Sequence, residues 1–269
     1  MKQQLQKFLN IFKTSFWFLF NKFRSRKISY LTLLVIPMVF FVPLWWIPLS
    51  LFVGRVIESI YIATYHEFHV HKMLVPRSTL VEIIGCWRIA AGDFQSPGAK
   101  VLNHWKHHRW YKDTQLDPTE AKLHITNNVF YYLLDLGKQA PHQHIEIDAA
   151  NPSKTKVYSF FEKYWVEVCI LNLVVWLYFV PFWTFVCWFI LPVWFWGVVW
   201  RSIDWWTHKL GGADKDWLVF VYGSQCWHHY HHDYVKTQTD PYYGKGIWKI
   251  VNIDWWTQKI TFKKESNGL

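Results

Sequence analysis

The chain has 269 residues, of which 52% are hydrophobic and 20 are tryptophan, and its formal net charge is +10. Only 18% of the residues are charged, against about 25% in typical globular proteins, which excludes a disordered chain, a coiled coil and a basic nucleic-acid tail. The mean hydropathy is close to zero. A membrane-buried protein would score higher and a water-soluble one lower, so we expect a membrane part and a polar part in one chain.

The first predicted element is the N-terminal segment, residues 1–27. It contains seven lysine and arginine residues and no acidic residue, and its leucines and phenylalanines recur at helical spacing. This pattern predicts an amphipathic helix that lies in the membrane interface beside an anionic leaflet. A cleaved signal peptide fits less well, because Lys13 and Lys22 interrupt the apolar stretch and no small-residue cleavage site follows.

Two long apolar runs follow, residues 28–65 and 165–206, which are 38 and 42 residues long. One helix crosses a bilayer with about 20 apolar residues, so each run is long enough for two crossings joined by a turn. Pro43, Pro48 and Pro181 lie near the middle of these runs, where such hairpins would turn. The sequence therefore predicts an all-α integral membrane protein with four transmembrane helices arranged as two hairpins.

The basic residues predict the orientation of these spans. Of the 29 lysines and arginines, 7 lie in residues 1–27, 12 in residues 66–164 and 8 in residues 207–269. Cytoplasmic flanks of membrane segments accumulate such residues, and two hairpins return all three blocks to that side. We expect a multi-pass membrane domain, residues 28–269, with both termini and a helical cap (66–164 and 207–269) in the cytoplasm. No compact basic cluster with interleaved aromatic residues indicates a nucleic-acid partner.

Fourteen histidines form the second unusual feature of the composition, and eleven of them fall into three short boxes and one isolated position. These are His66, His69 and His71; His104, His107 and His108; His228, His229, His231 and His232; and His208. The second and third boxes share the spacing HxxHH, which on an α-helix projects three imidazoles from one stripe. His66 and His71 diverge by about 140° on a regular helix. If both are ligands, either the helix ends near His71 or the two residues bind different ions.

Imidazole ligands suit iron, zinc, copper and nickel, and about nine of them exceed what one ion accepts. The boxes therefore predict two metal ions in a nitrogen-rich shell. Soluble di-iron proteins use glutamates and Glu-x-x-His pairs from a four-helix bundle, and the boxes here offer almost no carboxylate at those spacings. A di-iron oxygenase at the membrane face is the interpretation that uses all of these histidines. His124, His142 and His144 stand alone and are expected to bind no metal.

The boxes resemble those of the membrane-bound fatty-acyl desaturases of the acyl-CoA, delta-9-like type, which read HxxxxH, HxxHH and HxxHH. A ninth family histidine follows the last membrane span and matches His208. The matching positions are His66, His71, His104, His107, His108, His208, His228, His231 and His232. Segments 96–118 and 243–255 are also similar to the family, and the resemblance covers about residues 30–260.

This resemblance implies two iron ions held by those nine histidines, with O2 as co-substrate. The implied reaction introduces a double bond into an acyl chain, carried as an acyl thioester or by a membrane lipid. The chain has no HPGG haem motif, so the resemblance implies a separate electron donor such as cytochrome b5 or a ferredoxin. Residues 119–122 depart from the family where it contacts the acyl carrier.

Several residues near the boxes have expected roles beside the metals. Asp204 occupies the place of a family asparagine, which makes it a candidate water-mediated ligand or a partner of a ligand. Glu67, Asp113 and Asp117 are candidate partners that orient ligand imidazoles, although capping of surface turns is an equal alternative for these three. His69 and His229 are additional to the family pattern and are expected to lie outside the ligand set.

Two other functions remain open at this point. A fatty-acyl or alkyl hydroxylase on the same scaffold would share the first hydrogen abstraction. A His-rich membrane metal transporter or haem protein, from a different class, would need polar or histidine residues at mid-membrane depth, and the two apolar runs contain no histidine. For an acyl substrate we expect an apolar tunnel with tryptophan and aliphatic residues in its wall, but no individual substrate-binding residue is assigned.

Overall fold

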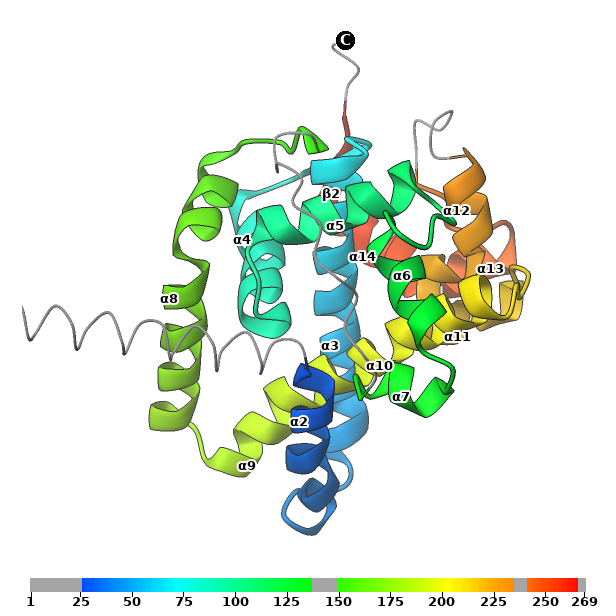
Figure 1. Ribbon diagram of the computed structural model, residues 1–269. Coiled ribbons are helices and arrows are strands. Elements are labelled where there is room, and N and C mark those ends of the chain that lie inside the picture. The colour runs from blue at the N-terminus through cyan, green and yellow to red at the C-terminus, as the bar shows by residue number, and fades with distance from the viewer. Residues whose placement is uncertain (1–25, 137–149, 235–240, 266–269) are drawn as a thin grey trace, which may run out of the picture.

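The computed structural model describes residues 26–136, 150–234 and 241–265, and these are mostly helical (Figure 1). Except for Arg26 and Lys27, the predicted interfacial helix 1–27 lies outside the described residues, as do His142 and His144.

The helices and strands follow the apolar and polar blocks of the sequence. The first apolar run contains α2 (Lys27–Val35), the 3-10 helix η1 (Ile36–Phe40) and α3 (Trp46–Ile62), which continues as the π-helix η2 (Ala63–Val70). The middle block contains β1 (Leu74–Pro76), α4 (Thr79–Trp87), the π-helix η3 (Arg88–Gly92), α5 (Pro97–Arg109), α6 (Pro118–Ile125) and α7 (Val129–Leu133).

The remaining elements come from the second apolar run and the C-terminal block. They are α8 (Lys156–Phe179), α9 (Phe182–Phe185), the π-helix η5 (Val186–Ile190), α10 (Leu191–Asp204) and the π-helix η6 (Trp205–Lys209). After these come η7 (Asp216–Leu218), α11 (Val219–Tyr222), η8 (Gly223–Trp227), α12 (His228–Tyr234), α13 (Ile247–Val251), α14 (Ile253–Thr261) and β2 (Phe262–Lys264).

Two continuous helices in the described part of the chain are long and apolar enough to cross a membrane. One passes through α3 and η2 over 25 residues, Trp46–Val70, and the other passes from α9 to η6 over 28 residues, Phe182–Lys209. A shorter apolar helix covers Lys27–Met38. The chain breaks near two of the predicted prolines, since α3 begins shortly after Pro43 and Pro181 separates α8 from α9. Pro48 instead lies in the first turn of α3, where a helix tolerates proline.

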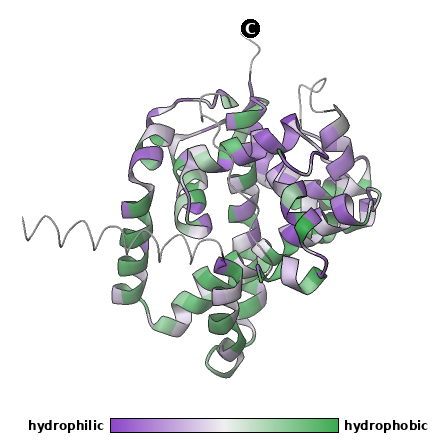
Figure 2. Ribbon diagram, in the orientation of Figure 1, coloured by the Kyte–Doolittle hydropathy of each residue, from purple (hydrophilic) through white to green (hydrophobic). Residues whose placement is uncertain are grey.

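Apolar and polar side chains gather at opposite ends of the molecule (Figure 2). The connection between η1 and α3 and the second half of α8 lie at the apolar end, and both present large side chains to the outside. These include Phe40, Phe41, Leu44, Trp45, Leu171, Val174, Leu177, Tyr178 and Phe179. Exposed apolar side chains in this number mark a region of contact with a membrane or another protein.

Charged residues inside the first apolar run are buried and paired with residues from the polar blocks. Arg55 on α3 lies 2.7 Å from Asp254 on α14. One turn further along, Glu58 accepts a hydrogen bond of 2.6 Å from Nε of Arg88 on η3. A buried charge is tolerated only with such a partner, so these pairs attach the far half of α3 to the polar end of the molecule.

A small antiparallel sheet departs from the all-α prediction. Strand β1 pairs with β2 in the register Leu74 opposite Lys264 and Pro76 opposite Phe262. Pro76 lacks a backbone N–H and cannot continue a helix, but it fits at the edge of a sheet. The sheet connects the chain just after the first histidine box to the C-terminal segment.

Candidate metal centre

The first histidine box lies at the end of a π-helix. The backbone N–H of His71 donates to the carbonyl of His66 over 2.9 Å, a bond that spans five residues. This wider turn brings the two imidazoles together, with ring centroids 4.9 Å apart. Helix η2 ends at Val70, and His71 is its C-cap. The sequence predicted that the helix ends near His71 if His66 and His71 bind at one site. The helix does end there.

The second box lies on α5, which begins with two local signals. The Ser96 side chain accepts from the backbone N–H of Ala99, and Pro97 occupies the first helical position. The third box lies on the short helix α12. His208 lies on η6, the π-helix at the end of α10, so two of the four ligand-bearing segments are π-helical. Such irregular turns are frequent at functional sites.

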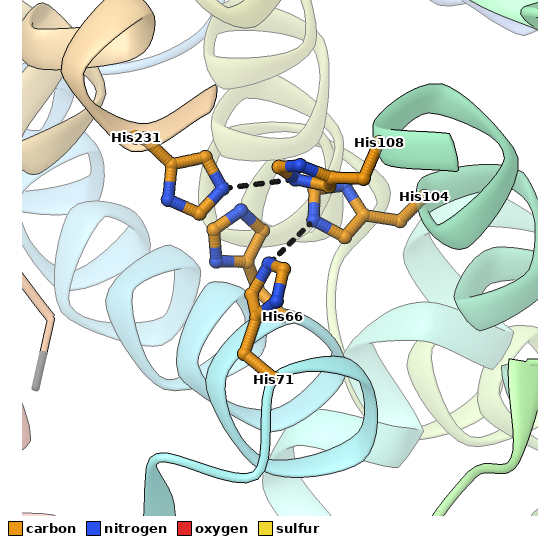
Figure 3. A group of neighbouring side chains, drawn as sticks. All are labelled: His66, His71, His104, His108 and His231. Carbon is orange, nitrogen blue, oxygen red and sulfur yellow. Dashed lines mark hydrogen bonds between the residues drawn. The ribbon is translucent and has the colours of Figure 1, made fainter. Parts of the chain in front are cut away.

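The nine predicted histidines come together in two groups, and in each group one nitrogen per residue lies within 4.8 Å of all the others. Group one consists of His66, His71, His104, His108 and His231, whose rings converge from η2, α5 and α12 (Figure 3). Group two consists of His107, His208, His228 and His232. The groups are adjacent, since the rings of His108 and His232 lie 4.5 Å apart.

Each HxxHH box divides its histidines between the two groups. In the second box the first and last residues, His104 and His108, face group one and the middle residue faces group two. In the third box the first and last residues, His228 and His232, face group two and His231 faces group one. The prediction of a single stripe was too simple. Positions i and i+4 differ by about 40° around a helix, whereas i+3 and i+4 differ by about 100°, so one helix serves two neighbouring sites.

The spacing of the imidazole nitrogens suits metal coordination. Nε2 atoms face each other at 2.7 Å in His208 and His228, 2.9 Å in His108 and His231, and 3.1 Å in His228 and His232. Two metal–nitrogen bonds of about 2.0–2.1 Å place their nitrogens about 2.9–3.4 Å apart at octahedral or tetrahedral angles. Two of the three distances lie in this range and the shortest lies just below it, so these donors are compatible with one ion in each group.

Most of these imidazoles are held neutral by their surroundings. Burial, followed by the influence of neighbouring imidazoles, lowers the pKa below the usual value of about 6.5. This holds for the pKa of His71, His104, His108, His228, His231 and His232. A neutral imidazole has a free lone pair, which is the form that binds a metal ion.

Three carboxylates fix the orientation of ligand rings. Nδ1 of His66 donates to Glu67 over 2.9 Å, and Nδ1 of His107 donates to the fully buried Asp117 over 2.9 Å. Nδ1 of His208 donates over 2.7 Å to a third carboxylate, Glu120 on α6. Each bond leaves Nε2 free to face its group, as in many metal sites.

Two of these three carboxylates were predicted. Glu67 and Asp117 each contact an imidazole, one of the two roles considered for them, and Asp117 also caps α6. Asp113 accepts from the backbone N–H groups of Gln115 and Leu116 and so has the other role, capping a surface turn. Glu120 was missed. Its signal was its position in the first turn of α6, three residues after the Asp117 N-cap, which places both carboxylates at one helix end.

The remaining described histidines lie outside both groups. His124 is exposed on α6, and His229 lies 3.3 Å from a carboxylate oxygen of Asp214. His69 is buried beside Glu82 and Cys86.

A cavity of about 290 Å³ touches both groups. Its wall includes His66 and His104 of group one, His107 and His228 of group two, and Asp204 at the end of α10. Asp204 thus lies beside the centre, at the position where a candidate water-mediated ligand was predicted.

The cavities near the centre are more polar than the predicted tunnel. Tyr65, Gln95, Lys100 and Asn103 line the first cavity, and a second cavity of about 500 Å³ shares the last three of these residues. Trp200 is the one tryptophan in either wall. The cavities are polar because they lie beside the parts of α3 and α10 that face the polar blocks and are distant from the apolar end.

Comparison of the chain with models of protein families, with curated proteins and with solved structures gives no match.

Proposed function

We propose that this chain is a membrane-embedded, di-iron, O2-dependent fatty-acyl desaturase. The observation that carries the proposal is the convergence of the nine predicted imidazoles into two adjacent groups. Three carboxylates that orient imidazole rings support it further. The resemblance of the three boxes to those of desaturases implies two neighbouring metal sites with histidine ligands. The two groups match that arrangement.

The proposed membrane arrangement has four spans and places the metal centre outside the hydrocarbon. A rise of about 1.5 Å per residue makes the 25-residue and 28-residue helices roughly 38 and 42 Å long, more than the hydrocarbon thickness of about 30 Å. His66 and His208 lie near the C-terminal ends of these two helices, in η2 and η6. The 24-residue helix α8 would supply a third span. The apolar helix Lys27–Met38 is roughly 18 Å long and would form the fourth together with the connection that leads into α3. The basic blocks then face the cytoplasm.

The proposed chemistry divides between metals and protein. Two irons, when bound, would supply the activation of O2 and the removal of two hydrogens from an unactivated acyl chain. The nine histidines would hold the irons, and Glu67, Asp117 and Glu120 would keep the ligand tautomers and ring orientations fixed. Asp204, in the wall of the cavity, would hold a water molecule beside the centre.

The proposed partners follow from this chemistry. The substrate is a membrane lipid or an acyl thioester that enters from the apolar end, and positioning within the protein decides which carbons react. Electrons come from a separate donor protein such as cytochrome b5 or a ferredoxin.

A hydroxylase on the same scaffold is the second candidate, and one observation favours it. The cavity beside both groups is lined by Lys100, Gln95, Asn103 and Asp204. Polar walls suit a substrate with polar groups near the reacting carbon, whereas a plain acyl chain favours an apolar wall.

A bis-histidine haem protein fits the geometry less well. A porphyrin between two axial imidazoles needs a flat slot that separates their rings. Here the rings pack directly on one another, with centroids 4.1 Å apart for His66 and His104 and 4.3 Å apart for His66 and His231. The groups are shaped as cages for single ions.

The test is a reconstitution with purified full-length protein in detergent. The protein is loaded with Fe2+ and supplied with a reductant, an electron-transfer protein, O2 and acyl-CoA, acyl-carrier or phospholipid substrates, and products are analysed by mass spectrometry. Desaturation removes two hydrogens, and hydroxylation adds one oxygen. We expect the first product. The second product would favour the hydroxylase, and an iron-loaded protein that yields neither product from any substrate would refute both. A His108→Ala variant controls for reaction outside the centre.

A further inference from the structure

A third cluster of possible metal ligands lies outside the two histidine groups. It consists of His69 on η2 and of Glu82 and Cys86 on α4, with one ligand atom of each within 4.8 Å of the others. His69 and Cys86 are fully buried, and Glu82 is 7% exposed. Glu82 and Cys86 are four residues apart on one helix, so their side chains lie on the same face.

The imidazole of His69 needs a partner that the described residues do not supply in good geometry. Neither of its ring nitrogens makes a well-aligned hydrogen bond within the described part of the chain. The backbone of Ser153 lies near the ring, and the ring packs against Phe68 and Tyr158 with centroids 4.6 and 4.8 Å apart. A buried polar group without a good partner destabilises the fold, and a metal ion bound to one nitrogen removes that destabilisation.

Among the described residues, no salt bridge joins Glu82 or Cys86 to a cationic side chain. Glu82 accepts hydrogen bonds from the Thr155 hydroxyl and the Tyr158 backbone, which are both neutral groups. Burial, followed by the charges of Glu82 and Glu162, raises the pKa of the Cys86 thiol. Two acidic groups side by side in the interior favour a bound cation, because a coordinated thiol loses its proton to the metal.

We propose that His69, Glu82 and Cys86 bind one divalent metal ion of the zinc type. Nitrogen, oxygen and sulfur donors together are typical of Zn2+. Zinc bonds of about 2.0–2.3 Å place tetrahedral ligand atoms about 3.3–3.8 Å apart, so small side-chain movements close the site. Water or the Thr155 hydroxyl completes the coordination.

The position of the site indicates a structural role. None of its three ligands lines the two cavities beside the histidine groups, which sets the site apart from the proposed reaction centre. The metal joins α4 to η2, the π-helix that also carries His66. The two elements are in close contact, because a Cβ added at Gly85 would lie 2.0 Å from the Thr64 hydroxyl. The bound ion would hold the π-helical turn in the shape that group one requires.

The experiment uses Co2+ as a spectroscopic probe for Zn2+. Purified full-length protein is stripped of metal, titrated with Co2+ and followed by near-ultraviolet absorption and metal analysis. The histidine groups contain no sulfur, so a thiolate-to-cobalt charge-transfer band reports on the third site alone. We expect one such band per chain in the wild type, at one equivalent.

Matched variants assign the band. Cys86→Ser and His69→Gln should lose the band and one equivalent of Co2+. Cys187→Ser should keep both, because Cys187 is equally buried but lies on η5 and belongs to none of the candidate metal groups among the described residues. A wild-type protein without the band, or loss of the band in Cys187→Ser, overturns the proposal whether or not the other variants fold. This test is independent of turnover, so its failure is distinct from failure of the proposed desaturase.

Discussion

The two histidine groups use the same helices but are held in different ways. In group one, four of five imidazoles come as pairs from a single element, His66 with His71 and His104 with His108. In group two only His228 and His232 come as a pair, from α12, whereas His107 and His208 come singly and each is held by a carboxylate. Carboxylates thus fix both single imidazoles of group two, whereas among the described residues of group one a carboxylate holds only His66. The two sites should therefore fail in different ways.

The largest effect is expected from removing one ligand of each group. His107 and His108 are sequence neighbours but face different groups. In the proposed function, His107→Ala should empty group two and His108→Ala should empty group one. Each should lower turnover by about 10³-fold or more, since both metals act as a unit. Metal analysis should give about one iron per chain in place of two.

His124→Ala is the matched control, because His124 is exposed and lies outside both groups. It should keep full iron content and turnover. If His107→Ala and His108→Ala retain both irons, the assignment of two groups is wrong.

A smaller effect is expected from the carboxylates that orient the single imidazoles. Asp117→Asn keeps the N-cap of α6 but removes the charge that holds His107. Such partners are worth about 10–100-fold in metal affinity, so a Fe2+ titration should show group two weakened by that amount. Adding Glu120→Gln should weaken it further, since His208 then loses its charged partner as well.

Asp113→Asn controls for the loss of a carboxylate near the box. Asp113 accepts only from backbone N–H groups of a surface turn, so iron affinity should not change. Equal weakening by Asp113→Asn and Asp117→Asn would contradict the assigned roles.

The metal-free protein should lose stability in acid, and group one should contribute more to the loss. Four imidazoles of group one and two of group two have a lowered pKa in the folded chain. Below about pH 6.5 the unfolded chain binds protons that the folded chain does not, so stability is full above this pH and falls as the pH decreases. Each such imidazole contributes roughly 1 kcal/mol per pH unit. Thermal unfolding between pH 7 and 5.5 should show this fall, and His104→Gln should reduce its slope where His124→Gln does not.

The set of histidines that converge was predictable, but its division into two groups was not. Spacing points to the three boxes and His208, the resemblance to desaturases selects nine imidazoles among them, and all nine come together. Their distribution over two groups depends on the angle at which α5 and α12 face each other, which is a tertiary property. The π-helical turn at His66 was not itself predictable. The sequence showed only that a regular helix would point His66 and His71 in different directions.

The fold was predictable where hydrophobicity decides it. The break at Pro181 and the apolar helices follow from composition, and two of these helices are long and apolar enough to cross a membrane. The ends of the helices were not predictable. Helix α3 continues as η2 to Val70, because ion pairs such as Arg55 with Asp254 stabilise it within the polar end of the molecule. The helix propensities of single residues give no information about such long-range pairs.

The smallest effect is expected at Asp204, which belongs to neither group but lies beside both. It lines the cavity with His66 and His107, and Tyr132 is its hydrogen-bond partner. Asp204→Asn keeps an oxygen that can accept from Tyr132, and in the proposed function it restores the asparagine expected at this position of a desaturase. Turnover should stay within about tenfold of the wild type, with both irons retained. If iron stays bound but turnover is lost, the carboxylate charge itself takes part in the reaction, and this centre differs in mechanism from the family that it resembles.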